Sequence, residues 1–331
     1  MILREFLYVD TDKVRAMLAQ LEGGVAEEER ETDREEKRTT VGPRTVAQHF
    51  QGVGSERYTQ KSLGDALFPM LEDALESESL LRDISEEVTN TDLWNTEEIQ
   101  RMAPPGSLVR ITAPGSLFDS RYVANSFSAF AAVSMGLQGI GALESPPPRQ
   151  NSGKNPKGQQ RKPKPGEVTR EELEDSIPDF RMKSGETIVD AVDLRSILQV
   201  SRGVFAPGLH MNLSPVESSD ILITSRLQEG RQYLDSESDI LFARYGTEEQ
   251  EWTVVGSVGH YGSKDPVQPD DAFFNSNGAV SRGKLASFMN AHMRTLAETG
   301  FVDLVQYPGV SLIPFAVYRS IPRAAGVIAA R

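Results

Sequence analysis

The amino-acid sequence predicts an α+β fold, in which a mixed sheet is combined with long amphipathic helices. Short segments rich in β-branched and aromatic residues are interleaved with longer segments whose apolar residues recur at helical spacing. Two strand-then-helix units occur in the N-terminal half, and the C-terminal half is richer in strand patterns. Four or more strands interleaved with long helices favour the α+β class.

The first strand-then-helix unit occupies residues 3–21. Residues 6–9 form a short run of the kind found in buried strands. Asp10 or Thr11 then offers a side-chain oxygen that caps a helix. The apolar face of this helix consists of Val14, Met17, Leu18 and Leu21. This spacing places the unit in the core.

A second helix is predicted after Ser62, which we expect to be its N-cap. Pro69 interrupts the pattern, so we expect a kink or a late start there. Its polar side includes Glu72, which we expect to point outward. Trp94 follows in a connecting segment and is interpreted as an anchor on the core.

The second strand-then-helix unit starts with residues 107–114, and Asp119 or Ser120 caps the helix that follows, from about residue 121 to 137. No charged residue occurs between Arg121 and Glu144. That length would suffice to cross a bilayer. However, many of its residues are Asn, Gln, Ser or Gly, which insert poorly. We therefore expect a buried helix and no membrane association.

In the C-terminal half, residues 189–200 are consistent with a helix or a broken strand pair, and residues 220–224 with a strand. Residues 240–245 and 252–258 are interpreted as a hairpin. A helix opens at Ser281 or Gly283 and ends at Gly300. Its apolar side includes His292, which we interpret as a core histidine.

The last predicted strand spans residues 310–318 and contains Pro314, which we expect to confine it to an edge or a bulge.

The sequence divides into two halves around a Pro/Lys-rich segment, whose residues 145–166 are dominated by Pro, Gly, Asn, Gln and Lys. Residues 1–143 form an N-terminal half, with a charged flexible segment at 26–58. Residues 144–176 read as a flexible insertion rich in Pro and Lys, and residues 177–331 form the C-terminal half. Both separate domains and one shared domain are compatible with this division.

Composition limits the classes of partner and compartment. The formal net charge is −13 at pH 7, which makes binding to nucleic acid unfavourable because phosphates would be repelled. The sequence has no cysteine, which rules out disulfides and thiolate metal sites. The first residues contain no long apolar run of the secretory type. These features predict a cytoplasmic protein.

Four stretches carry a resemblance to a known family. They are REFLYVDTDKVRAMLAQLEGGV at the start, KSLGDALFPMLEDAL, SLVRITAPGSLFDS and EWTVVGSVG. The chain resembles a family of uncharacterised bacterial proteins labelled as a domain of unknown function. The resemblance implies a bacterial cytoplasmic origin, and it supplies no catalytic residues.

The sequence contains no familiar catalytic motif. It lacks the P-loop pattern and the G-x-S-x-G nucleophile elbow. Its four histidines, at 49, 210, 260 and 292, show no metal-ligand spacing. We therefore assign no catalytic, cofactor-binding or metal-binding residues, and no cofactor.

Two functional hypotheses follow. The first is a non-enzymatic interaction or regulatory protein with a protein partner, whose oligomeric state the sequence leaves open. The second is a metal-dependent hydrolase or phosphoryl enzyme, in which strand-end carboxylates bind the metal. Its candidate ligands are Asp10, Asp12, Asp119 and Asp220. Helix capping explains Asp10 and Asp119 without a metal, so we favour the first hypothesis.

Overall fold

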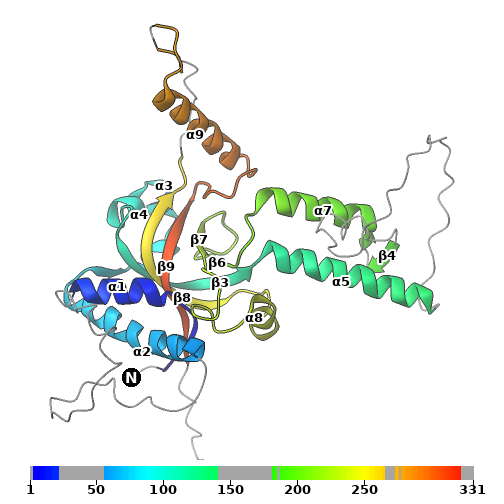
Figure 1. Cartoon of the computed structure of the whole chain (residues 1–331), viewed down its shortest axis with the longest axis horizontal. Helices are drawn as coiled ribbons and strands as arrows, with labels where there is room; N and C mark the ends of the chain where they lie inside the picture. Colours follow the sequence, from blue (N-terminus) through cyan, green and yellow to red (C-terminus); the bar gives the residue numbers. More distant parts are fainter. Residues whose placement is uncertain are drawn as a thin grey trace, which may run out of the picture. The chain divides into compact units, whose positions relative to one another are not determined.

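A computed structural model describes residues 3–21, 56–140, 181–184, 187–264, 273–275 and 277–321 (Figure 1). The chain forms two compact units. Unit 1 consists of residues 1–118, 208–271 and 304–331, and unit 2 of residues 119–207 and 272–303. The predicted flexible insertion at 144–176 and most of the charged segment at 26–58 lie outside the described residues.

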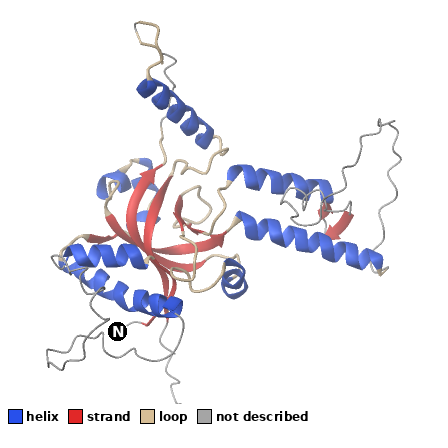
Figure 2. Cartoon of the chain, in the orientation of Figure 1, coloured by secondary structure: helices blue, strands red, loops and turns tan. Residues whose placement is uncertain are grey.

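Unit 1 is built on a mixed sheet of seven strands, so the predicted α+β class is confirmed (Figure 2). The strands are β1 (Leu3–Val9), β2 (Leu81–Asp83), β3 (Leu108–Phe118), β6 (His210–Leu213), β7 (Leu222–Arg226), β8 (Gln250–Tyr261) and β9 (Gly309–Ile321). β2 runs parallel to β3 and β7 parallel to β9, and the other pairings are antiparallel.

The pairings close five of these strands into a small barrel. β3 pairs with β8, β8 with β9, β9 with β7, β7 with β6, and β6 with β3 again. β1 extends the sheet beside β9, and β2 extends it beside β3. Both halves of the chain supply strands, because β1 to β3 precede the Pro/Lys-rich segment and β6 to β9 follow it. A closed ring removes most of the free strand edges.

The strand register places fully buried apolar residues inside the barrel. Ile111 pairs with Val254, and Leu213 pairs with Ile223. At Gly256 the β9 backbone approaches so closely that an added Cβ would overlap the carbonyl of residue 313. Glycine is therefore required here by close backbone approach.

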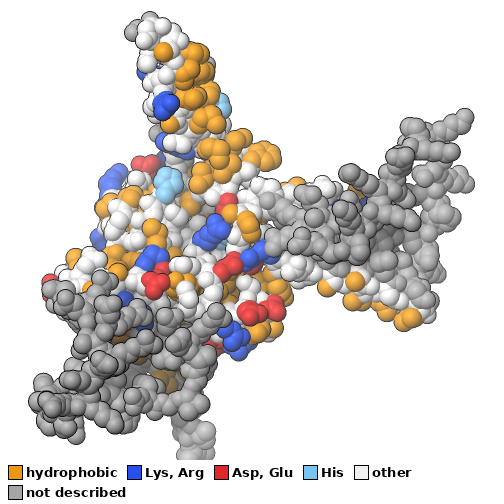
Figure 3. Space-filling model, in the orientation of Figure 1, with side chains coloured by type: hydrophobic (Ala, Val, Ile, Leu, Met, Phe, Trp, Pro, Cys, Tyr) orange, Lys and Arg blue, Asp and Glu red, His pale blue; other side chains and the backbone are white. Residues whose placement is uncertain are grey.

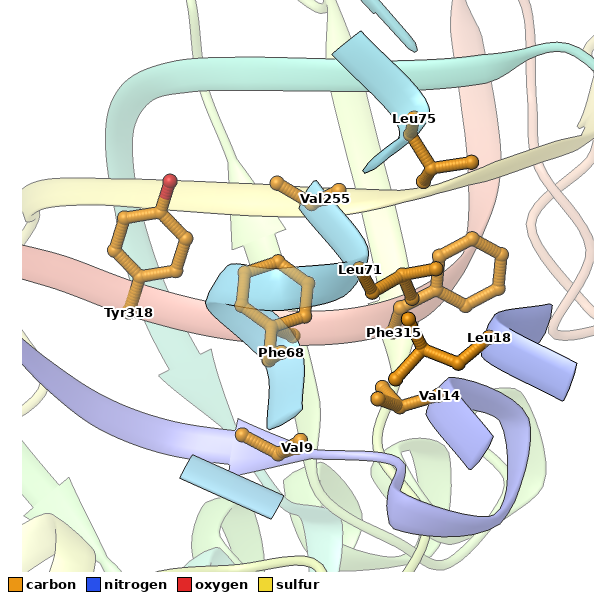
Figure 4. Packing of buried hydrophobic residues seen from close by; sticks show 10 residues of the cluster. Val9, Val14, Leu18, Phe68, Leu71, Leu75, Val255, Phe315 and Tyr318 are labelled. Carbon is orange, nitrogen blue, oxygen red and sulfur yellow. The ribbon is translucent and has the colours of Figure 1, made fainter. Parts of the chain in front are cut away.

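Two helices, α1 (Thr11–Leu21) and α2 (Glu56–Ser77), cover the outer face of β1, β8 and β9 (Figure 4). The shared core consists of Val9, Val14, Leu18, Phe68, Leu71, Leu75, Val255, Phe315, Ala316 and Tyr318. The predicted unit at residues 3–21 is confirmed. The prediction for Ser62 is wrong, because α2 already begins at Glu56 and continues through Pro69.

Shorter helices complete unit 1. They are the 3₁₀ helix η3 (Glu87–Thr89), α3 (Thr91–Asn95), α4 (Glu98–Met102) and α8 (Ser238–Tyr245). Trp94 lies in α3 and not in a connecting segment, but it is an anchor as predicted, since it is buried and donates its indole N–H to the Val88 carbonyl at 2.9 Å. The predicted hairpin is wrong: residues 240–245 belong to α8, which buries Leu241 and Tyr245 one helical turn apart.

Strand β9 occupies the middle of the sheet rather than an edge, because it pairs with β8 on one side and with β7 and β1 on the other. Pro314 pairs with Gly256 next to a shift in register. Of the two alternatives for Pro314, the bulge is therefore correct and the edge is wrong.

The described part of unit 2 contains three long helices, α5 (Ser120–Gly139), α7 (Ala191–Val204) and α9 (Arg282–Glu298). A hairpin of β4 (Arg181–Ser184) and β5 (Thr187–Asp190) precedes α7. Residues 189–200 therefore form a strand end followed by a helix. α5 and α7 pack side by side (Figure 1). Among the described residues, no helix has the length and apolar character needed to cross a membrane.

Candidate interaction surface

Helix α9 has well-defined signals at both ends. The Ser281 side-chain oxygen accepts a hydrogen bond from the Lys284 amide at 3.4 Å, as an N-cap does. At the other end, Gly300 has a φ of 77°, and the Phe301 amide donates to the Leu296 carbonyl at 2.9 Å. This hydrogen bond across a left-handed glycine is typical of a Schellman motif, which brings Phe301 beside Leu296.

One side of α9 carries a largely apolar stripe, in which Leu285 and Phe288 are half-buried and the other side chains are exposed. The α9 stripe consists of Leu285, Phe288, Met289, His292, Met293 and Leu296, which share one helix face. Met289 is 55% exposed, Met293 42% and Leu296 44%. Figure 3 shows apolar side chains gathered along this side of the helix. Contiguous exposed side chains of this size are typical of an interaction site.

Aromatic contacts order part of the α9 stripe. The Phe288 ring lies 5.3 Å from that of Phe273 and 4.2 Å from that of His292, measured between centroids. The His292 Nδ1 lies 3.1 Å from the Phe288 carbonyl oxygen. His292 itself is exposed, so its interpretation as a core histidine is wrong. The helical spacing was correct, but the face it defines is not buried in the core.

The other two long helices of unit 2 also expose apolar side chains. On α5, Val133 is 59% exposed, and Ile140, just beyond the helix, is 78% exposed. On α7, Ile197 is 51% exposed and Val200 63%. The expectation that the charge-free helix is buried is therefore wrong, since Ala124 is the one buried side chain among those described from residue 121 to 140. A helix without charged residues is normally covered on most of its surface.

The strand-end carboxylate Asp10 is a helix cap. It is buried, and its Oδ1 accepts a hydrogen bond from the Lys13 amide at 3.0 Å. Its Oδ2 accepts from the Tyr8 hydroxyl at 3.3 Å and forms an ion pair with the Lys13 ammonium. Burial, together with the nearby Asp10 carboxylate, raises the pKa of Tyr8. These contacts occupy both oxygens of Asp10 with groups of the protein.

The remaining predicted carboxylates are also engaged or exposed. Asp12 accepts a hydrogen bond from the Tyr233 hydroxyl at 2.6 Å, and this bond raises the pKa of Tyr233. Asp119 caps α5, accepting from the Arg121 amide at 2.8 Å and pairing with its guanidinium at 2.8 Å. Asp220 is exposed. Within the described part of the chain, no three acidic or histidine side chains lie close enough to hold a metal.

The histidines occupy separate places in the fold. His210 is buried in β6, with its Nδ1 3.0 Å from the Gly208 carbonyl oxygen. His260 is exposed at the end of β8. His49 lies outside the described residues.

A buried ion cluster lies between α2 and the sheet, and sequence reasoning missed it. Glu72, which we expected to point outward, is 2% exposed. Its Oε1 accepts hydrogen bonds from the Arg110 Nη2 at 2.6 Å and Nε at 3.0 Å, and from the Tyr318 hydroxyl at 3.1 Å. Arg4 pairs with its other oxygen. Burial and the Glu72 charge raise the pKa of Tyr318 to about 12. The cluster ties α2 to β1, β3 and β9.

Comparison with known proteins identifies a family for the chain but does not indicate a function. A family model described as "Domain of unknown function (DUF6414)" matches residues 3–318. No curated protein and no solved structure matches the chain.

Proposed function

We propose that this chain, which belongs to the DUF6414 family of unknown function, is a non-enzymatic cytoplasmic protein that binds a protein partner. The observation that carries the proposal is the α9 stripe, which is largely apolar and exposes Met289, Met293 and Leu296 to solvent. Unit 1 supplies a folded scaffold with a closed barrel and a packed helical cover. Unit 2 supplies the binding surface. A bacterial origin is part of the proposal and follows from the resemblance noted in the sequence.

The chemistry of the α9 stripe fits a protein partner. Met289 and Met293 are flexible and polarisable, so they adapt to the side chains of a partner. Phe288 and Leu296 supply larger apolar anchors at the helical spacing used when helices dock into grooves. A partner helix that covers this face removes apolar surface from water, and this removal drives most protein association.

The alternative function, a metal-dependent hydrolase or phosphoryl enzyme, finds less support. Its candidate ligands Asp10 and Asp119 cap helices and contact cationic side chains. Titration of the protein with Mg²⁺, Mn²⁺ or Zn²⁺ in a calorimeter tests this alternative. A saturable heat that disappears in an Asp10→Asn variant would favour the enzyme.

Site-specific photo-crosslinking in the native host cell tests the proposed function. A photoreactive phenylalanine analogue replaces Met289 on the α9 stripe, and a matched control carries it at Arg294, which is exposed on the polar side. We expect a discrete adduct with protein from Met289 and none from Arg294. Equal labelling from the two positions, or no adduct from Met289, would contradict the proposal.

A further inference from the structure

The side chains of the α9 stripe are spaced symmetrically about the middle of the helix. Leu285 and Leu296 lie at equal distances in sequence from the midpoint between Asn290 and Ala291. The same holds for Phe288 with Met293, and for Met289 with His292. An isologous contact joins one surface to the same surface of a second copy. If one residue of the first copy contacts another residue of the second, the reverse contact also forms. Two copies of α9 in antiparallel orientation therefore match large side chain to large side chain along the whole stripe.

The charges of α9 favour the same orientation. Arg282 and Lys284 lie in the first turn, which contains no acidic residue. Cations are unfavourable at that end of a helix and favourable at the carboxyl end. An antiparallel pair places these cations beside the carboxyl end of the other helix, where Glu298 lies in the last turn. A parallel pair would instead bring the cations of both copies together.

The net charge of the whole chain limits where two copies can meet. At −13 per chain, most surfaces of two copies repel each other. Between Ser281 and Phe301 the sequence has three Lys or Arg residues and one acidic residue, so α9 is locally cationic. In the antiparallel pair, the first-turn cations of one α9 lie beside Glu298 of the other copy and not beside each other, so the like charges of the two helices are kept apart.

We propose that α9 pairs with the α9 of a second copy of this chain, antiparallel, about a two-fold axis between Asn290 and Ala291. This proposal rests on the proposed function and names the partner. Leu285 of each copy then lies opposite Leu296 of the other.

The absence of cysteine in the sequence permits a direct test by single-cysteine variants. In an antiparallel pair, the two copies of residue 289 are offset along the helix axis by about 4.5 Å, and the two copies of residue 285 by about 16.5 Å, at 1.5 Å per residue. A disulfide needs Cα atoms within about 7 Å. Met289→Cys is therefore within reach of its own copy, and Leu285→Cys is not.

Under mild oxidation of the full chain, we expect Met289→Cys to form a disulfide-linked dimer at a rate at least about tenfold above Leu285→Cys. A mixture of Leu285→Cys and Leu296→Cys chains should give the linked heterodimer, because these positions lie opposite each other. Efficient linking of Leu285→Cys to itself would indicate a parallel pair and overturn the proposal.

Sedimentation of the cysteine-free chain gives an independent readout. We expect a mass of twice 36.4 kDa, and a single-chain mass when Met289 and Met293 are both replaced by Asp. Asn290→Asp, which adds one acid without changing the stripe, should remain a dimer. Unchanged circular dichroism of all variants shows that they are folded.

The outcomes separate this inference from the proposed function. A single-chain mass for the unmodified protein, together with a photo-crosslinked adduct of different composition, would overturn self-pairing and leave the proposed function standing. Loss of both signals would overturn both. A single-chain mass with binding to vesicles of phosphatidylglycerol and phosphatidylcholine would show that α9 contacts lipid and would also overturn the pairing.

Discussion

Glu72→Gln removes one negative charge from the buried cluster with little change in side-chain volume. The carboxylate is 2% exposed and accepts three hydrogen bonds through Oε1, two of them from Arg110. Removing one partner of a buried ion pair costs about 3–5 kcal/mol. The Arg110 and Arg4 side chains are 19% and 25% exposed, so water partly solvates them and lowers this cost. Arg110 also keeps its ion pair with Glu76.

We therefore expect Glu72→Gln to lower the free energy of unfolding by about 2–3 kcal/mol. Urea unfolding followed by tryptophan fluorescence measures it, because Trp94 and Trp252 are both buried in unit 1 and are the two tryptophans of the chain. Glu76→Gln is the matched control, since its carboxylate is 49% exposed, and should cost less than about 1 kcal/mol. Equal losses in the two variants, or a loss for Glu72→Gln below about 0.5 kcal/mol, would refute the reasoning.

Three further predictions concern unit 1. Asp10→Asn should keep the cap on the Lys13 amide but lose the ion pair with the partly exposed Lys13 ammonium, so it should cost less than about 1 kcal/mol. Asp10→Ala also leaves the Lys13 amide and the Tyr8 hydroxyl without an acceptor and should cost about 2 kcal/mol, and Val9→Asp should cost more still, as differential scanning calorimetry would show. Ser225→Ala should be neutral or stabilising in urea unfolding, because the buried Ser225 hydroxyl has no hydrogen-bond partner among the described residues. Burial raises the pKa of Tyr261 to about 12 from its ordinary value near 10, so its contribution to stability is complete below pH 10 and falls as the pH rises to 12. Tyr261→Phe should reduce that alkaline loss while costing about 1 kcal/mol at neutral pH, through its lost hydrogen bond to the Ala103 carbonyl.

Local patterns predicted the elements whose signals lie within a few residues of each other. The unit at residues 3–21 is an example, because strand run, cap and helix face follow directly in sequence and the structure keeps all three. The same holds for Asp119 and α5. By contrast, the barrel depends on pairs such as Leu108 with Ser257, far apart in the chain, and no local pattern encodes them.

The errors have physical causes that local patterns do not contain. Residues 240–245 have strand-like composition, but tertiary packing selects a helix that buries Leu241 and Tyr245. The sequence placed Glu72 on the surface because charged groups are rarely buried alone. Its partners Arg4 and Arg110 come from strands distant in sequence, so only the fold shows that its charge is compensated.

The candidate surface was predictable only in part. The spacing from Leu285 to Leu296 correctly indicated an amphipathic helix, and its end at Gly300 was also correct. Whether such a face packs on the chain's own core or on a partner depends on tertiary structure. Periodicity alone is the same in both cases.

Oxidation of methionines in the native protein tests the central claim, that a protein contact covers the α9 stripe. Met70 on α2 is 53% exposed and Met289 is 55% exposed in the single chain, so their intrinsic accessibility is matched. Brief treatment with hydrogen peroxide, followed by mass spectrometry of peptides, gives the oxidation rate of each residue. We predict that Met70 reacts readily while Met289 and Met293 are protected, and that Met289→Asp restores the reactivity of Met293. Equal oxidation of Met70, Met289 and Met293 in the unmodified protein would contradict the claim.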